Sequence, residues 1–124
     1  MKLTRIYAGA DGQSHFEDLE LPMDESQRRA TSESLLATTA AFGVSDQLAA
    51  QDWHHAPRRQ LVAVLSGALE IRCGDGSTRR FGVGDVFLAD DLAGQGHHTS
   101  DVGGPMRLLY VHLPDELDPA KWRK

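Results

Sequence analysis

The segment WHHAPRRQ at residues 53–60 runs on to the turn sequence LSG at residues 65–67. A second block, FGVGDVFL at residues 81–88, leads into GQGHHT at residues 94–99. These two blocks hold four of the six histidines of the chain, and each pair lies on an expected strand beside a turn. Imidazoles on strands far apart in the sequence meet only where a sheet curls back on itself. The pattern therefore predicts a small curled β-protein whose histidines line a pocket for a metal or a ligand.

The composition narrows the class of protein. A length of 124 residues suits one domain with one core, and 40% hydrophobic with 25% charged residues is typical of a folded globular chain. The net charge of −5 opposes a nucleic-acid partner, because neutralising phosphates needs an excess of Lys and Arg. The single cysteine, Cys73, excludes an internal disulfide framework. No apolar run has the length of a membrane span or of a signal peptide, so we expect no membrane partner and a cytoplasmic protein.

Short apolar runs broken by Gly, Asp and Pro recur along the chain, as is typical of strands and turns. We expect an all-β protein in one domain over residues 1–124, in which residues 1–40 form N-terminal strands and a loop leading into a barrel. Asp118 followed by Pro119 predicts a short C-terminal helix. The expected strands span residues 4–8, 15–21, 41–49, 52–56, 60–66, 68–73, 77–81, 85–89, 97–101 and 106–113. The expected apolar interior consists of Leu61, Val64, Leu69, Ile71, Phe81, Val86, Leu88 and Leu109.

The first histidine block is similar to the first motif of cupins, G-x5-H-x-H-x(3,4)-E-x6-G. Gly67 matches the closing glycine, and counting back places Gln60 at the Glu position. His55 then matches the second histidine, while Trp53 stands where the first histidine belongs. This block therefore resembles a cupin motif with two of its usual ligands replaced.

The second block resembles the second cupin motif, G-x5-P-x-G-x2-H-x3-N. Gly84 opens it, Asp90 replaces the proline, and His97 is the counterpart of the histidine. The chain thus resembles a small single-domain cupin over residues 41–113, within a subgroup that carries Trp-His-x-Ala-Pro-Arg-Arg-Gln. The resemblance implies a double-stranded β-helix, which is a jelly-roll barrel.

The resemblance also implies a site. His55 and His97 are the implied catalytic residues, and together with Gln60 they are the implied ligands of one divalent transition metal such as Fe, Mn, Ni or Zn. This set is poorer than the three His and one Glu of a usual cupin, because Gln60 offers only a neutral carbonyl oxygen. Trp53, Gln60 and Tyr110 are the expected ligand-binding residues. Trp53 is either a wall of the pocket or a platform on which a flat ligand stacks.

Strand alternation predicts which histidines face the pocket, because successive side chains point to opposite faces. Trp53 and His55 share a face, so if His55 lies inside the barrel then His54 points outward. By the same rule His97 lies inside and His98 outside.

Three other pairs of residues have less specific interpretations. Asp90-Asp91 is interpreted as a solvated turn. Arg58-Arg59 is either a solvated turn or the source of one guanidinium that closes over an anionic ligand. In the last strand, Tyr110 and His112 share a face opposite Leu109 and either line the pocket or lie at the surface.

Three functions remain open at this stage. The first is a metal-dependent oxygenase, isomerase or lyase acting on a small organic molecule through His55 and His97. In the second, the pocket holds no metal, a histidine acts as general base, and Gln60 or Tyr110 orients the substrate. The third is a non-catalytic protein that binds a small molecule. We also expect a homodimer, since small cupins pair through strand edges.

Overall fold

The computed structural model describes residues 1–46 and 50–123. Nearly all regular structure in these residues is β-strand, as expected. The elements are β1 Lys2–Ala8, β2 Ser14–Glu20, β3 Met23–Asp24, β4 Thr31–Ser32, β5 Thr39–Ser45, β6 Ala50–His54, β7 Gln60–Ser66, β8 Ala68–Cys73, β9 Thr78–Gly82, β10 Val86–Asp90, β11 His97–Asp101, β12 Met106–His112 and the 3-10 helix η1 Pro119–Trp122. No helix among the described residues is long and apolar enough to cross a membrane.

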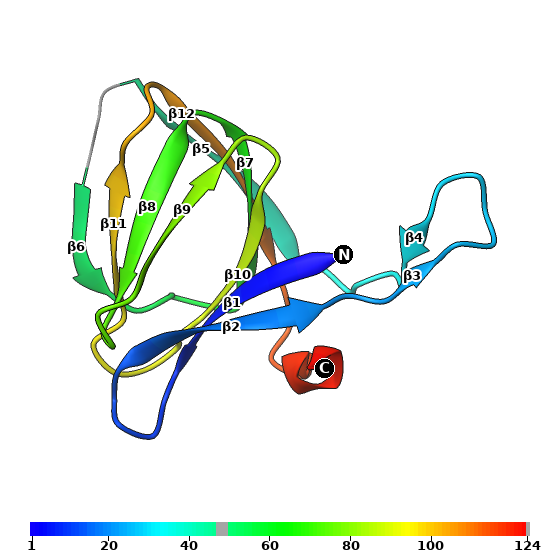
Figure 1. The fold of residues 1–124 in the computed structure, drawn as a ribbon, viewed down its shortest axis with the longest axis horizontal. Coiled ribbons are helices and arrows are strands. Elements are labelled where there is room, and N and C mark those ends of the chain that lie inside the picture. The colour runs from blue at the N-terminus through cyan, green and yellow to red at the C-terminus, as the bar shows by residue number, and fades with distance from the viewer. Residues whose placement is uncertain (47–49, 124) are drawn as a thin grey trace.

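The strands from β5 onward form the jelly roll that the cupin resemblance implies. One sheet contains the order β10-β7-β12-β5 and the other the order β6-β11-β8-β9, so strands far apart in sequence become neighbours. From β5 to β12, successive strands alternate between the two sheets except for β8 and β9, which form a hairpin within one sheet, and this is the pattern of a jelly roll. Figure 1 shows the two sheets facing each other. The predicted fold class is confirmed by this strand order.

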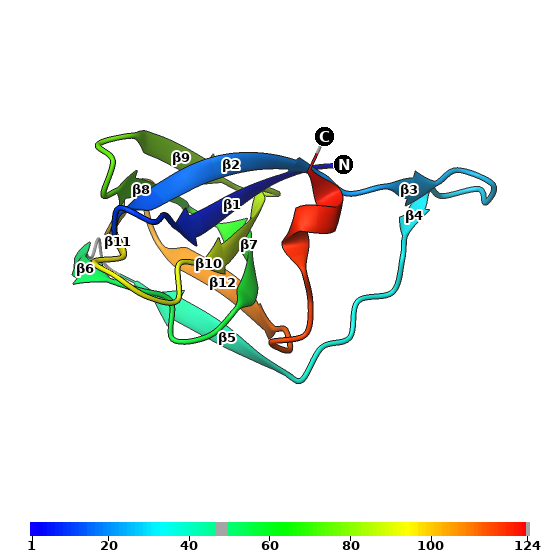
Figure 2. The same ribbon diagram turned by 90° about the horizontal axis from the view of Figure 1, so that it is seen from below.

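The N-terminal hairpin widens one of the two sheets. β1 pairs with β10 in parallel and with β2 in antiparallel, which gives the six-stranded order β2-β1-β10-β7-β12-β5. The small β3–β4 hairpin projects from the body as an arm, and the C-terminal η1 lies close to the N-terminus (Figures 1 and 2). Asp118 caps η1, because its carboxylate accepts a hydrogen bond from the Ala120 amide at 3.0 Å.

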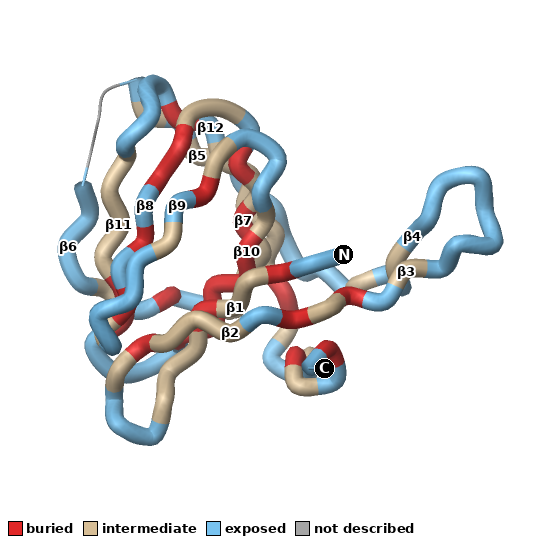
Figure 3. Tube along the Cα trace, viewed as in Figure 1, coloured by how far each residue is buried: buried red, intermediate tan, exposed pale blue. Residues whose placement is uncertain are grey.

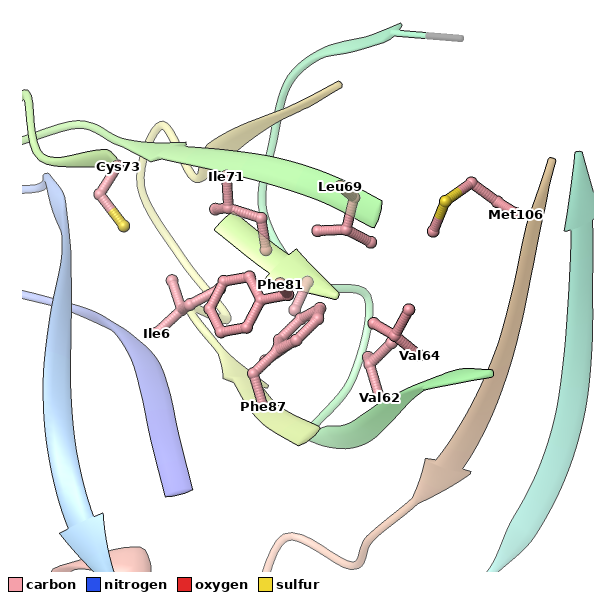
Figure 4. Packing of buried hydrophobic residues seen from close by; sticks show 11 residues of the cluster. Ile6, Val62, Val64, Leu69, Ile71, Cys73, Phe81, Phe87 and Met106 are labelled. Atoms are coloured by element: carbon pink, nitrogen blue, oxygen red, sulfur yellow. The ribbon is translucent and has the colours of Figure 1, made fainter. Parts of the chain in front are cut away.

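The space between the sheets contains the first hydrophobic cluster. Phe81 and Phe87 lie at its centre with ring centroids 4.7 Å apart, and side chains from both sheets surround them (Figure 4). Its buried members are Ile6, Ala56, Val62, Val64, Leu69, Ile71, Cys73, Phe81, Phe87, Ala89 and Met106. Strands β7, β8 and β10 contribute alternate residues to this interior, which explains why their pattern can be recognised in the sequence.

A second cluster lies on the outer face of the six-stranded sheet. Trp122 of η1 is buried there, together with side chains from the N-terminal strands and Leu88. In β10 the four consecutive residues Phe87–Asp90 are buried, as expected for a strand that is packed on both faces (Figure 3). Of the expected interior residues, Leu61 and Val86 pack against this outer cluster, whereas Leu109 belongs to neither cluster. The assignment of Leu109 to the interior is therefore wrong, because Tyr110 takes the inward position on β12.

One strand boundary differs from its prediction in a way that matters for the site. The strand expected over residues 52–56 ends at His54, and it begins at Ala50. The strand expected over residues 41–49 is β5, which ends at Ser45. Residues 47–49 of that prediction lie outside the described residues.

Candidate functional site

A cavity of about 310 Å³ lies inside the barrel, between the two sheets. Apolar side chains such as Val62, Leu69 and Phe87 form its floor and continue into the hydrophobic core. None of the described residues that line it is Asp, Glu, Lys or Arg. Its polar lining residues are Gln51, His54, Gln60, His97, Thr99, Tyr110 and His112.

His97 is held in the cavity wall by a buried carboxylate. Its Nδ1 lies 2.5 Å from Oδ2 of Asp91, and these side chains are among the least exposed polar groups of the chain, at 5% and 0% of their residue surfaces. The geometry requires Nδ1 to donate to the carboxylate when Asp91 is ionised. Nε2 is therefore the nitrogen that His97 offers to a molecule in the cavity.

His54 lies directly beside His97. The two residues face each other across β6 and β11, and their ring centroids are 4.5 Å apart. The Nδ1 of His54 is 2.8 Å from the carbonyl oxygen of Asp52, which can only accept a hydrogen bond. Neutral His54 therefore also keeps its lone pair on Nε2. The site contains two imidazoles in the same tautomer.

His55, predicted to be inside, is exposed and does not line the cavity. Its Nδ1 contacts the carbonyl oxygen of Ala56 at 3.0 Å. Trp53 is also outside, 36% exposed and edge-on to His98 at 6.1 Å between centroids. The interior placement of His55 and Trp53, with His54 outside, is wrong.

Trp53, His54 and His55 do alternate as predicted, but the face that lies inward is opposite to the predicted one, and a register irregularity lies next to them between β6 and β11. His97 pairs with His54 and Thr99 pairs with Gln51, so two steps along β11 correspond to three steps along β6. The extra residue is a β-bulge, and it lets Gln51 and His54 line the same cavity despite their odd spacing. Simple alternation therefore fails between Gln51 and His54, whereas it holds from Trp53 to His55.

The structure does place His97, Gln60 and Tyr110 at the cavity. Gln60 and His112 are paired neighbours on β7 and β12, and both side chains reach the cavity wall. His112 is oriented by Thr39, whose hydroxyl lies 2.5 Å from its Nδ1. The sequence left Tyr110 and His112 either in the pocket or at the surface, and the structure places both of them in the pocket. The catalytic and ligand-binding roles of these residues stay predictions.

Burial affects two other titratable groups of the interior. Burial raises the pKa of the Tyr110 phenol, with a smaller contribution from Asp101. Tyr110 is therefore a neutral hydrogen-bond donor at physiological pH. Burial also raises the pKa of Cys73 to about 11, so this thiol, which pairs with His97 across β8 and β11, stays protonated. A protonated thiol is a poor nucleophile.

The adjacent acids Asp90 and Asp91 are buried, so their interpretation as a solvated turn is wrong. Asp90 points to the outer face of the sheet, where it forms ion pairs with Arg5 at 2.8 Å and Arg59 at 2.7 Å. Arg59 also donates to the carbonyl oxygen of Asp115 at 3.1 Å. Arg59 is therefore neither solvated nor free to close over a ligand in the cavity. This network anchors the end of β10 immediately before Asp91.

Sequence reasoning missed His54, Asp91, Gln51 and Thr99. Asp91 lies six residues before His97, at the start of the loop that joins β10 to β11. An acid at one end of a loop and a histidine at the other is the signal that could have suggested this contact. No comparable sequence signal identifies which face of β6 lies inward.

A metal requires more ligands than this cavity supplies. Among the described residues, no three His, Cys, Asp or Glu side chains are close enough together to hold a metal ion. His54 and His97 suit a metal, since metal-binding imidazoles usually donate their other N–H to a carboxylate or carbonyl. Gln60, the remaining expected ligand, lines the same cavity but offers only a neutral amide. The donor set is therefore incomplete for a tightly held divalent ion.

Comparisons with known proteins add little beyond the fold. No protein-family model and no curated protein matches the chain. Among solved structures, protein NMB1881 of Neisseria meningitidis is 15% identical with a TM-score of 0.48, over 60% of this chain and 74% of that one. The EutQ protein of Salmonella typhimurium is 17% identical with a TM-score of 0.46, over 92% of this chain and 96% of that one. The SPY1581 protein of Streptococcus pyogenes is 21% identical with a TM-score of 0.45, over 74% of this chain and 79% of that one. These likenesses are weak, and the jelly-roll assignment rests on the strand order of this chain.

Proposed function

We propose that the barrel binds a small uncharged organic molecule and that His97 accepts a hydrogen bond, and in a reaction a proton, from it. The buried His97–Asp91 pair in the cavity wall carries this proposal. A carboxylate without charge neutralisation in the interior is costly, so its placement behind a cavity histidine suggests a chemical role. The absence of charged side chains among the described lining residues favours an uncharged ligand.

The proposed proton transfer follows from which ring nitrogen of His97 carries the proton. With Nδ1–H directed at Asp91, the lone pair of His97 Nε2 is available to a hydroxyl, phenol or acidic C–H group. If His97 takes the proton, the Asp91 carboxylate stabilises the imidazolium that forms. Tyr110 and Gln60 then orient the ligand by donating hydrogen bonds to its oxygen atoms. Such proton transfer is the step that isomerases and lyases share.

Asp91→Asn tests the tautomer directly. The amide that this substitution introduces can donate to Nδ1, and this would move the ring proton of His97 to Nε2 and remove the acceptor. We expect the imidazole nitrogen shifts of His97 to report the exchanged tautomer and binding of 4-methylphenol, the probe, to fall at least tenfold. His98→Gln, on the opposite face of β11, is the matched control and should bind the probe like the parent. Equal affinity of D91N and the parent would refute the proposal.

A second candidate function is binding of one divalent metal ion, Fe, Mn, Ni or Zn, by His54 and His97. The observation that favours it is the engagement of both Nδ1 atoms, which leaves both Nε2 atoms for a metal. Elemental analysis of protein purified without a histidine tag tests it. About one metal per chain, lost in His97→Gln, would support this candidate, whereas less than a tenth of an equivalent would reject it.

We further infer a cytoplasmic homodimer among the small cupins that share the Trp-His-x-Ala-Pro-Arg-Arg-Gln pattern of residues 53–60. The reduced, buried Cys73 is compatible with a reducing compartment. The outer edge of β5, which pairs with no other strand of the described residues, supports pairing with a second copy, since exposed strand edges need cover.

A further inference from the structure

The turn between β1 and β2 lies against the loop that joins β10 to β11 (Figures 1 and 2). The Gly12 carbonyl oxygen accepts a hydrogen bond from the Gln95 amide at 3.3 Å, and a Cβ atom on Gly94 would lie 2.5 Å from the same oxygen. This loop begins at Asp91 and leads into His97, and no residue between these two is charged. The N-terminal hairpin therefore contacts the segment that presents the cavity histidine.

Ser14, the buried first residue of β2, joins this loop to the turn between β8 and β9. Its hydroxyl donates to the carbonyl oxygen of Gly96 at 2.7 Å and accepts from the Gly74 amide at 2.8 Å. Its own carbonyl oxygen accepts from the Asp75 amide at 3.2 Å. Because Gly96 directly precedes His97, Ser14 links the β8–β9 turn to the start of β11.

His15 follows Ser14 and lies between two carboxylates. Its Nε2 is 3.1 Å from both carboxylate oxygens of Asp11 in the same hairpin, and its Nδ1 is 3.2 Å from Oδ2 of Asp75 in the β8–β9 turn. A neutral imidazole has one N–H and can donate to only one of these carboxylates, whereas an imidazolium donates to both. The link between the two turns is therefore complete only when His15 is protonated.

The groups around the His15 ring favour its charge. The carboxylate of Asp11 raises the pKa of His15 above its usual value, and Asp75 adds to this, while burial of the ring opposes both. Tyr7 of β1 stacks on the ring with centroids 5.4 Å apart. Arg5 lies 5.2 Å from the Tyr7 ring, but two other carboxylates neutralise its guanidinium.

We propose that His15 is a pH switch, which holds the β1–β2 turn against the β8–β9 turn when charged and loses one of its two carboxylate contacts when neutral. This inference goes beyond the proposed function, since it does not depend on what the cavity binds. The charged state is fully formed below the unfolded pKa of about 6.5 and is lost as the pH rises through the higher folded pKa. The loop that leads into His97 is therefore held less firmly in alkaline than in mildly acidic solution.

Amide hydrogen exchange of the whole protein, followed by NMR from about pH 6 to pH 9, tests the switch. The Gly74 and Asp75 amides report the contact with the β8–β9 turn, and the Gln95 amide reports the contact with the loop. After correction for the intrinsic dependence of exchange on pH, we expect the protection of these three amides to fall by roughly threefold or more. The Gly84 amide, which donates to Val64 at the opposite end of β9, should keep its protection.

Two variants identify the groups that act. His15→Gln cannot become charged, so the three amides should show the low protection at every pH. Asp11→Asn removes the carboxylate that raises the pKa of His15 most, so the midpoint of the change should move to lower pH. His98→Gln is the matched control, because the ring of His98 contacts Trp53 rather than a carboxylate, and it should exchange like the parent.

The outcomes decide the inference in either direction. A fall in protection that is present in the parent and in His98→Gln but absent from His15→Gln supports the switch. Constant protection of the parent across this range of pH would overturn it, and so would an equal fall in His15→Gln. A parallel fall at Gly84 would show that the whole barrel loosens, which also contradicts a switch at the β1–β2 turn.

Discussion

Replacing Gly96 by Ala should both destabilise the barrel and disable the cavity. Gly96 has a φ of +79°, and a Cβ atom on it would lie 1.9 Å from the carbonyl oxygen of His54. The same Cβ would lie 2.3 Å from the backbone nitrogen of His55. These contacts are with backbone, so no side-chain rotation can relieve them. β6 must move by roughly 1.5 Å to restore an ordinary contact of about 3.4 Å.

The magnitude follows from two separate costs. A left-handed alanine costs about 1–2 kcal/mol by itself. Moving the end of β6 also weakens its pairing with β11, and each lost hydrogen bond costs about 1 kcal/mol. We therefore expect Gly96→Ala to lose roughly 3 kcal/mol of unfolding free energy. With a urea slope of about 2 kcal/mol/M, the unfolding midpoint falls by roughly 1.5 M.

Gly76→Ala is the matched control for this experiment. Gly76 has a φ of +92°, yet a Cβ atom on it would meet nothing within 4 Å. It therefore incurs the left-handed cost alone, about 1–2 kcal/mol, and its midpoint falls by about 0.5–1 M. Urea unfolding followed by circular dichroism measures both variants. Equal midpoints for the two would show that the backbone of His54 does not lie against Gly96, and the reasoning about the site would fail with it.

Three further predictions concern the site, the pH dependence and the assembly. His54→Gln should lower 4-methylphenol affinity at least tenfold in NMR titrations while His55→Gln leaves it unchanged, and the reverse order would place His55 in the cavity instead of His54. The carboxylate of Asp11 raises the pKa of His15, so the charged imidazole is stabilised in the folded state. The charged His15 therefore contributes its full stabilisation below the unfolded pKa of about 6.5, and this stabilisation is lost as the pH rises through the higher folded pKa. Above pH 6.5 the urea midpoint of the parent should fall relative to that of His15→Gln. For the proposed homodimer, Phe42→Asp on the β5 edge, where Phe42 is 74% exposed, should give a monomer by light scattering, and an unchanged dimer would place the interface elsewhere.

The fold was predictable because its determinants are local. Period-two apolar patterns mark the strands, and glycine-rich turns mark their ends, so β7 and β8 start and stop where the sequence indicates. The positions of His97, Gln60 and Tyr110 at the cavity follow from the same alternation within regular strands. The short β3–β4 hairpin lies in a polar segment without such a pattern, and the sequence did not indicate it.

The error at His54 and His55 has a different origin. Which of two adjacent residues faces inward depends on the register of β6 against β11, and a one-residue change in register reverses every side chain. That register is set by contacts between residues some forty positions apart, including the close approach of Gly96 to His54. Local periodicity carries no information about such a contact. The cupin motif spacing could not supply it either, because it was counted back from Gly67 across the irregular segment between β6 and β7.

The two adjacent carboxylates are both buried but differ in how their oxygens are paired. Both oxygens of Asp90 are paired, with Arg59 at 2.7 Å on one and Arg5 at 2.8 Å on the other. Asp91 is more deeply buried, yet within the described residues its Oδ1 has no hydrogen-bond partner and its Oδ2 contacts only the ring of His97. A buried oxygen without a partner costs stability, and an apolar residue at position 91 would avoid that cost. Asp90 therefore serves the fold, whereas the position of Asp91 fits the role that we propose for its contact with His97.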